Sequence, residues 1–305
     1  MSSHTHVLSG RCRFSVSVLI VGGGPAGVTA AIYTARAGLN TTIIYKDFGA
    51  LEKAHVENYY GFSKISGKSL VEKGLRQARK FGTKTIRDEV VNIKSDLIVE
   101  TASKSYEARA ILLATGTSRK SLAGQLSSLE KFEGRGVSYC AICDGFFYRG
   151  KDVAVLGSGA YALHEVNDLL PLVSSVTLLT NGDEPTVTFP DSVLIRKEKI
   201  MTLYSSMSTG LIKTENFQGV ILENQEKIPL SGLFVALGTA GGTALARKLG
   251  AEVIANAIKT DDQKRTTIPG IWAAGDCIGG IAQIAKAVHD GAEAGLSIVK
   301  TLRTK

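Results

Sequence analysis

Two cysteines separated by two residues are the most reactive pair in the sequence. The chain contains four cysteines, and Cys140 and Cys143 form its Cys-x-x-Cys motif. Such a pair closes a small ring, so its disulfide opens and re-forms without a large backbone movement. A structural zinc site needs four ligands, and the sequence has no second Cys-x-x-Cys and no histidine pair at finger spacing. We therefore expect a redox-active disulfide and no metal.

A glycine-rich run lies near the N-terminus. Residues 15–21 are apolar and predict a buried strand, and Gly22 to Gly27 follow at once. Residues 28–37 are alanine-rich and predict a helix, and residues 41–45 predict a second strand. Strand, G-x-G-x-x-G turn, helix and strand within about 30 residues are typical of a dinucleotide site. The glycines let the backbone approach a pyrophosphate, which the helix N-terminus attracts.

The same order of elements returns further along the chain. Residues 152–156 predict a strand, Gly157 to Ala162 form a G-x-G-x-x-A turn, and residues 163–170 predict a helix. Residues 176–179 predict the strand that follows. Two such units, about 135 residues apart, indicate a duplicated, doubly wound architecture. We expect the second unit to form its own domain.

Three further segments indicate how the domains connect. Residues 110–114 and 232–237 predict strands that end in small residues late in each unit, where the chain crosses between domains. Residues 270–275 predict a strand with Asp276 at its tip, before a helix over residues 282–301. An aspartate there can accept hydrogen bonds from the ribityl hydroxyls of a flavin, so this segment is expected to return to the first domain.

The expected fold class is therefore α/β, with two Rossmann-like nucleotide-binding domains, the second inserted in the first. Residues 1–118 and 243–305 are expected to form a discontinuous FAD-binding domain. Residues 119–242 are expected to form the inserted NAD(P)-binding-like domain that carries the Cys-x-x-Cys.

Composition limits the function classes. The net charge of +8 and the pI near 9.2 favour acidic partners through electrostatic steering. The basic residues are scattered, with no run longer than a pair, which argues against nucleic acid. No apolar stretch approaches the roughly 20 residues of a membrane span, and residues 1–14 lack the apolar core of a secretory signal. We expect a cytoplasmic protein with no membrane contact.

These motifs resemble the low-molecular-weight thioredoxin reductase family. The resemblance covers nearly the whole chain and rests on segments in the family's order: Gly22 to Gly27, Val56 to Phe62 (VENYYGF), Ala114 to Gly116, Cys140 to Gly145 (CAICDG), Gly157 to Ala162 and Ala273 to Asp276. It implies a homodimer with FAD in the discontinuous domain. It also implies a Cys-x-x-Cys that faces the flavin in one of two domain orientations, with thioredoxin or another protein disulfide as the substrate.

The resemblance further implies roles for particular residues. Cys143 is the flavin-proximal sulfur, Asn58 lies in a flavin-contacting segment, and Gln283 lies near the pyrimidine end of the flavin. The full set of expected FAD contacts is Gly22, Gly24, Pro25, Ala26, Gly27, Asn58, Thr115, Gly116, Gly275, Asp276, Gln283 and Ile284. In the second glycine turn, Gly157, Gly159 and Tyr161 are the candidate contacts of a pyrophosphate or a ring.

Several isolated polar residues have two interpretations. Asp144 follows the cysteine pair and is the candidate acid that protonates a leaving thiolate or a reduced flavin; the alternative is an ordinary N-cap carboxylate. Cys12 and Cys277 are expected to be buried or spare thiols. His289 either lies near the flavin, as the resemblance implies, or is a helix-surface or core histidine.

The sequence departs from the family at one site. Its NADPH-dependent members carry a His-Arg-Arg cluster after the strand that follows the second glycine turn. Residues 179–185 here offer two carboxylates, Asp183 and Glu184, and no cation. Carboxylates at that place repel a 2′-phosphate, so NADPH is not the expected electron donor.

Besides NADPH bound in an unconventional way, three alternatives for the second site and the donor remain open. NADH is one, with Asp183 accepting hydrogen bonds from the ribose hydroxyls. An acidic ferredoxin that reduces the flavin is another, as in the pyridine-nucleotide-independent branch of the family. The third is a second FAD or another planar cofactor in the inserted domain. A flavoprotein that senses redox state through its cysteine pair, without turnover, is the competing class of function.

Overall fold

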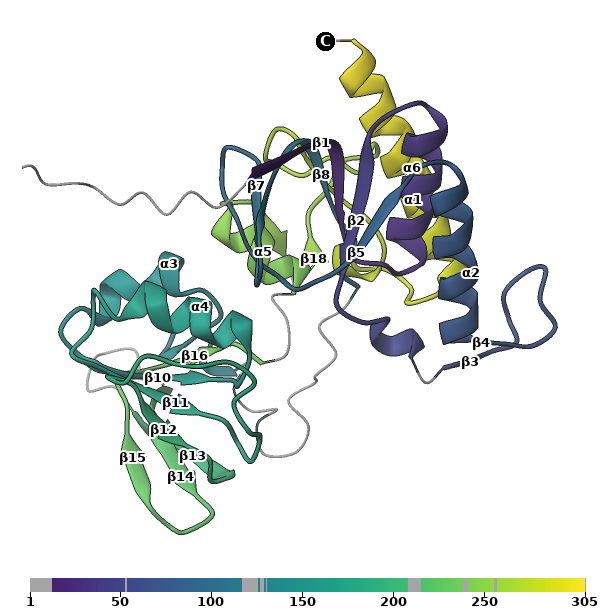
Figure 1. Ribbon diagram of the computed structural model, residues 1–305. Coiled ribbons are helices and arrows are strands. Elements are labelled where there is room, and N and C mark those ends of the chain that lie inside the picture. Colours follow the sequence, from purple (N-terminus) through teal and green to yellow (C-terminus); the bar gives the residue numbers. More distant parts are fainter. Residues whose placement is uncertain are drawn as a thin grey trace, which may run out of the picture.

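The computed structural model describes residues 13–52, 54–116, 126, 129, 131–207, 215–237, 241–254 and 257–304. The elements within them form two groups (Figure 1). Residues 13–116 and 241–304 build the first group, and residues 131–237 build the second. Both groups are α/β structures, as the duplicated strand-turn-helix pattern predicts.

A seven-stranded sheet is the centre of the first group. Its strand order is β5-β2-β1-β8-β7-β6, and β19 pairs with β8. The strands β5, β2, β1, β8 and β19 run parallel, whereas β7 pairs antiparallel with both β8 and β6. Because β19 comes from the C-terminal part of the chain, this sheet joins two segments distant in sequence. The strands are β1 (Arg13–Val21), β2 (Thr41–Tyr45), β5 (Lys84–Arg87), β6 (Val90–Ile93), β7 (Ile98–Thr101), β8 (Ser105–Leu113) and β19 (Ile271–Ala273).

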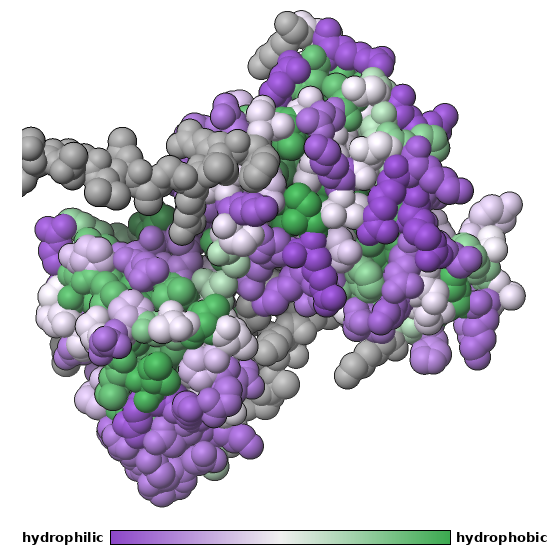
Figure 2. Space-filling model, in the orientation of Figure 1, coloured by the Kyte–Doolittle hydropathy of each residue, from purple (hydrophilic) through white to green (hydrophobic). Residues whose placement is uncertain are grey.

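Three helices cover one face of this sheet (Figure 1): α1 (Pro25–Arg36), α2 (Gly67–Lys80) and α6 (Ile284–Arg303). Helices α1 and α6 pack so closely that a Cβ on Gly291 would lie 2.2 Å from the carbonyl oxygen of Ala26. Helix α2 buries Val71, Leu75 and Ala78. The outer side of α2 is hydrophilic, as Figure 2 shows, which is the amphipathic pattern expected of a surface helix.

The second group is built on a five-stranded parallel sheet in the order β12-β11-β10-β16-β9. A three-stranded antiparallel sheet, β13-β14-β15, lies at one end of this group, where Figure 2 shows a hydrophilic tip. The elements are β9 (Val137–Ser138), α3 (Ala141–Asp144), β10 (Asp152–Leu156), α4 (Ala160–Leu169), β11 (Ser175–Leu179), β12 (Leu194–Arg196), β13 (Ile200–Met207), β14 (Glu215–Leu222), β15 (Lys227–Pro229) and β16 (Gly232–Val235).

Short elements complete the description. The first group contains the helix α5 (Gly242–Lys248), which contacts β6 and β18. The remaining pieces are β3 (His55–Val56), β4 (Ile65–Ser66), β17 (Val253–Ile254), β18 (Ala257–Ile258) and the single 3₁₀ turns Gly49–Leu51, Gly145–Tyr148 and Asp276–Ile278. Among the described residues, no helix is long and apolar enough to cross a membrane.

The elements match the sequence-based expectations in type and differ at their ends. The first helix begins at Pro25 rather than at residue 28, because proline suits the first helical position. Helix α4 likewise begins at Ala160, within the G-x-G-x-x-A run, rather than at residue 163. The expected domain change at residues 118 and 119 lies outside the described residues, as do Cys12, Gly238 and Thr239. The expected change at residues 242 and 243 falls at the first residue of α5.

Helix α4 carries a partly buried histidine and aspartate whose pKa values move in opposite directions. His164 Nε2 lies 3.5 Å from Asp168 Oδ2. Burial, and then the nearby Lys248 ammonium, lower the pKa of His164 to about 4, whereas burial raises the pKa of Asp168 to about 6 although Lys248 opposes that rise. Glu100 on the neighbouring strand β7 also faces both groups.

These two shifts predict opposite pH dependences. Between pH 6.5 and 4 the unfolded state protonates its histidine first, so His164 reduces stability on acidification. The folded state protonates Asp168 first, so that group increases stability as the pH falls below about 6. We expect the two contributions to offset one another in the wild type.

Two substitutions separate these contributions at pH 4.5. Relative to wild type, His164→Gln should therefore gain on the order of 1 kcal/mol of unfolding free energy, after solvent screening. Asp168→Asn should lose about the same amount. Denaturant unfolding at pH 4.5 and 7.5 measures both; parallel pH profiles for all three proteins would contradict the assignment.

Candidate active site

The first glycine turn joins β1 to α1 and has no room for side chains where its backbone is tightest. Gly22 has a φ of 116°, and a Cβ there would lie 2.2 Å from the carbonyl oxygen of Ala114. A Cβ on Gly27 would lie 2.1 Å from the carbonyl oxygen of Gly22. Gly24 caps α1, and its own Cβ position is open, with nothing within 4 Å. The turn therefore leaves a bare backbone surface at the N-terminus of α1, which suits a pyrophosphate.

A cavity opens in front of this turn, and ten of the twelve residues expected to contact FAD line it. Gly27 lies behind the turn, and Asn58 approaches through a hydrogen bond from its Nδ2 to Gln283 Oε1, 3.1 Å long. The lining residues are Gly22, Gly23, Gly24, Pro25, Ala26, Asp47, Phe48, Gly49, Leu51, Ala54, Ala114, Thr115, Gly116, Ala274, Gly275, Asp276, Ala282, Gln283, Ile284 and Ala287. The donor and acceptor set, with its glycine cradle, fits a flavin dinucleotide.

Asp47 lines the cavity and was missed by the sequence interpretation. It follows β2, and its Oδ1 accepts a hydrogen bond from Gly49 N at 2.8 Å. An acidic residue about 20 positions after the last glycine of the turn is the usual partner of a ribose hydroxyl in such folds. Asp47 stands 20 positions after Gly27, so that spacing was the available signal.

The strand-end turn that carries Asp276 is fixed by charged groups from α6. Asp290 Oδ2 accepts a hydrogen bond from Gly275 N at 3.1 Å. Lys286 Nζ donates to the carbonyl oxygens of Gly275 and Gly279 at 2.9 and 2.6 Å and lies 2.8 Å from Asp290 Oδ2. Asp290 is buried, so these contacts satisfy its charge and hold Asp276 at the cavity wall.

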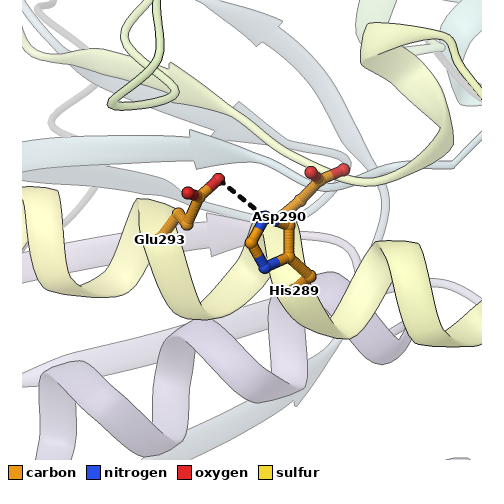
Figure 3. A group of neighbouring side chains, drawn as sticks. All are labelled: His289, Asp290 and Glu293. Atoms are coloured by element: carbon orange, nitrogen blue, oxygen red, sulfur yellow. Dashed lines mark ion pairs between the residues drawn. The ribbon is translucent and has the colours of Figure 1, made fainter.

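His289, Asp290 and Glu293 cluster on α6, and their ligand atoms lie within 4.8 Å of one another (Figure 3). His289 Nε2 lies 3.3 Å from Glu293 Oε2, and Lys264 Nζ lies 3.3 Å from Asp290 Oδ1 and 3.0 Å from Glu293 Oε2. Because lysines already balance both carboxylates, the arrangement fits an ion-pair network rather than a cation site. The exposed His289 is a helix-surface residue.

The cysteine pair lies in the second group as a disulfide at the start of α3. Cys140 is 2% exposed, whereas Cys143 is exposed. Cys140 is the N-cap of α3, and its Sγ accepts a hydrogen bond from Cys143 N at 3.2 Å. After reduction that N–H group can stabilise a thiolate at Cys140. An external disulfide can reach Cys143 directly.

Asp144 is held near the pair by Ser138. Its Oδ2 accepts a hydrogen bond from Ser138 Oγ at 2.6 Å, and Ser138 Oγ also accepts from Cys140 N at 3.1 Å. Asp144 makes no side-chain capping bond to the 3₁₀ turn that follows it, so it does not act as an N-cap carboxylate. Its role as a proton donor stays a prediction.

The second glycine turn, between β10 and α4, is covered by the segment after β11. Thr186 N and Thr186 Oγ1 both donate to the carbonyl oxygen of Ser158, at 2.8 and 3.2 Å. A Cβ on Gly159 would lie 3.5 Å from Thr186 Oγ1. The ring of Tyr161 is not free at this turn. It is buried, and its hydroxyl donates to the carbonyl oxygen of Tyr139 at 3.1 Å.

Cations near the second turn come from the segment between β12 and β13, which the sequence interpretation did not consider. Lys197 Nζ lies 2.6 Å from Glu184 Oε2, and the alkyl chain of Lys199 packs against Gly182. Residues 183–184 and 197–199 therefore carry two positive and three negative side chains. A 2′-phosphate would gain no net attraction there.

The fourth cysteine, Cys277, is a buried free thiol. It lies 3.3 Å from the carbonyl oxygens of both Leu113 and Ala274, so it is a donor inside the protein. Burial raises the pKa of Cys277 to about 12. It is therefore inert near neutral pH, as expected of a buried thiol.

A flavin-type cavity and a disulfide on two α/β units define a nucleotide-dependent disulfide oxidoreductase, and the comparisons with known proteins agree. The family model described as "Pyridine nucleotide-disulphide oxidoreductase" matches residues 16–291, and the chain belongs to this family. The thioredoxin reductase of Listeria monocytogenes is 35% identical over 297 residues, covering 93% of this chain and 92% of the relative. That of Bacillus subtilis is 33% identical over 298 residues, covering 92% and 93%.

Solved structures give the same result. An atypical thioredoxin reductase from Desulfovibrio vulgaris Hildenborough superposes with a TM-score of 0.83 at 35% identity, covering 95% of this chain and 99% of that one. A ferredoxin-flavin thioredoxin reductase from Clostridium acetobutylicum gives 0.69 at 29% identity, covering 96% and 100%. The protein is therefore a thioredoxin reductase-like, FAD-dependent disulfide oxidoreductase, as the resemblance predicts.

Proposed function

We propose that this enzyme passes electrons from FAD through Cys140 and Cys143 to thioredoxin or another protein disulfide, and that NADPH is not its electron donor. The claim that NADPH is not the donor rests on the second glycine turn. Thr186 is hydrogen-bonded to Ser158 in that turn and lies next to Gly159, and the corner beyond β11 has no net positive charge. A dianionic 2′-phosphate would gain no net electrostatic attraction there.

A ferredoxin is the donor that fits best. An electron carrier of this kind needs no nucleotide pocket, only a docking surface near the flavin. The net charge of +8 favours an acidic partner. One similar solved structure is described as a ferredoxin-flavin thioredoxin reductase, which supports the same choice.

Side chains of this protein take part in both halves of the reaction. Reduced FAD held in the cavity would supply an electron pair to the Cys140–Cys143 bond, and that bond, on taking up one proton, would open to one thiol and one thiolate. The thiolate then attacks an external disulfide, the mixed disulfide is resolved by the second cysteine, and the partner leaves with the two electrons and its protons. We assign Asp144, bonded to Ser138, to donating a proton to the leaving thiolate.

We further propose the wider setting that goes with this function: a homodimer in the reducing cytoplasm, with its domain changes near residues 118 and 242. The contacts proposed for FAD are the cavity residues together with Gly27 and Asn58. In the alternative in which Thr186 moves aside, a second nucleotide binds at the second turn. Its proposed contacts are then Gly157, Gly159 and Tyr161.

The donor is tested by anaerobic mixing of the FAD-loaded enzyme with NADPH, NADH or a reduced ferredoxin, following flavin bleaching near 450 nm. We expect ferredoxin to bleach the flavin at least about a hundredfold faster than either nucleotide. Prompt bleaching by NADPH would contradict the proposal, and prompt bleaching by NADH alone would favour the ribose contact at Asp183. Reduced flavin that never opens the disulfide would favour a redox sensor.

A further inference from the structure

The last turn of α5 is ion-paired twice to the other group of elements. Arg247 Nη2 lies 3.2 Å from Glu133 Oε1. Lys248 Nζ pairs with Glu165 Oε1, and both side chains are 1% exposed. Helix α5 belongs to the first group, whereas Glu133 and Glu165 belong to the second. The Lys248–Glu165 pair is therefore a buried ion pair between the two groups.

Glu165 also contacts the helix that carries the disulfide. Its Oε2 accepts a hydrogen bond from Ala141 N at 2.6 Å, and Ala141 stands between the two cysteines. On the other side, Cys143 Sγ lies 3.8 Å from the carbonyl oxygen of Arg247. One carboxylate thus connects Lys248 to the peptide that follows Cys140, and the disulfide rests against the C-terminal end of α5.

The surroundings of Lys248 make its pairing depend on this arrangement. Its Nζ lies 5.4 Å from the centre of the Tyr161 ring and 4.0 Å from Asp168 Oδ2, both on α4. A buried ammonium is tolerated only while its counter-charge is present. If the second group turns away, the Lys248–Glu165 ion pair breaks and both charged side chains must be hydrated.

The disulfide lies at the wrong end of α5 to meet a flavin. At its other end, Gly242 N donates to Thr115 Oγ1 at 2.9 Å, and Thr115 lines the flavin cavity. Seven helical residues separate the two ends by roughly 10 Å. The described residues that line the cavity all come from the first group. Electron transfer by direct contact therefore needs another placement of the second group.

We propose that Lys248 is a positioning residue that holds the second group with Cys143 turned outward, and that release of the Lys248–Glu165 pair gates reduction of the disulfide. This inference rests on the proposed passage of electrons from FAD to that disulfide. In this orientation the dithiol meets its external substrate, and the ion pair sets how often the flavin-facing orientation is visited.

The direct test is Lys248→Met in the full-length, FAD-loaded enzyme. The flavin is photoreduced anaerobically while the disulfide is oxidised, and its reoxidation by the enzyme's own disulfide is followed. Losing the pair destabilises the outward orientation, so we expect internal reoxidation about tenfold faster. In the pre-reduced enzyme, alkylation of Cys143 by iodoacetamide should become several-fold slower. Lys248→Arg, which keeps the charge, should restore both rates.

Two further variants separate this role from a merely structural one. Glu165→Gln keeps an acceptor for Ala141 N but removes the charge, and should accelerate reoxidation as Lys248→Met does. The double variant should be no faster than either single variant, because the two residues act as one pair. Lys259→Met removes an exposed pair with Glu252 in the first group and should leave both rates unchanged.

The outcomes remain distinguishable from those of the proposed function. If the wild-type flavin never reduces the disulfide, the proposed function fails. If wild type transfers electrons but Lys248→Met and Glu165→Gln leave both rates unchanged, or slow reoxidation, the gating role is wrong even where thermal stability falls.

Discussion

Cys143→Ser is expected to lower reduction of external protein disulfides by at least about a thousandfold while FAD stays bound. A serine hydroxyl cannot form or accept a disulfide, so the electron pair on the flavin has no route outward. The cavity proposed to hold FAD takes no lining residue from the described part of the second group, so flavin content should remain at the wild-type value. Turnover with thioredoxin and the absorbance of released flavin measure the two properties.

Cys277→Ser is the matched control for that variant. Cys277 is buried, and its thiol lies within reach of two backbone carbonyl oxygens that a hydroxyl can also reach. Activity should therefore remain within about twofold of wild type. Disulfide reductase activity retained in Cys143→Ser, or lost in Cys277→Ser, would mean that the wrong sulfur has been assigned to the chemistry.

The two glycine turns allow an equally sharp comparison, because the same substitution can be placed at the second glycine of each. Gly24→Ala should lose FAD affinity by at least tenfold. A Cβ at Gly24 meets no protein atom within 4 Å, and its φ of −75° suits alanine, so the fold is not strained. The new methyl group instead enters the space where a pyrophosphate would lie.

Gly159→Ala should leave the flavin content unchanged. Its Cβ would make an ordinary contact of 3.5 Å with Thr186 Oγ1, so the variant also folds. Flavin released by denaturation, expressed per polypeptide, decides the matter. A fall from two flavins to one in Gly159→Ala would establish a second FAD in the inserted half, and unchanged FAD binding in Gly24→Ala would place the flavin elsewhere.

Local patterns in the sequence were sufficient for the fold. The strand-turn-helix units at Gly22 and Gly157 depend on backbone geometry that only glycine allows and on short apolar runs, so the printed residues reveal them directly. The C-terminal strand that ends before Asp276 was predictable for the same reason, and β19 does pair with β8.

Contacts between distant segments were not predictable in the same way. Thr186 reaches Ser158 across 28 positions, and nothing local to either residue indicates that hydrogen bond. Lys248 and Glu165 look like ordinary surface charges on their helices, and only the packing of the two groups against each other buries them. Asp47 was the exception, because its spacing from Gly27 was visible in the sequence.

The most direct measurement supplies electrons without any natural donor. FAD-loaded enzyme is reduced anaerobically with one equivalent of dithionite and mixed with oxidised thioredoxin, and flavin absorbance and new thiols on thioredoxin are counted. The account predicts that the flavin is reoxidised and that two thioredoxin thiols appear per flavin, as a two-electron transfer requires. Flavin that stays reduced, because neither the enzyme's disulfide nor thioredoxin reoxidises it, would contradict the account.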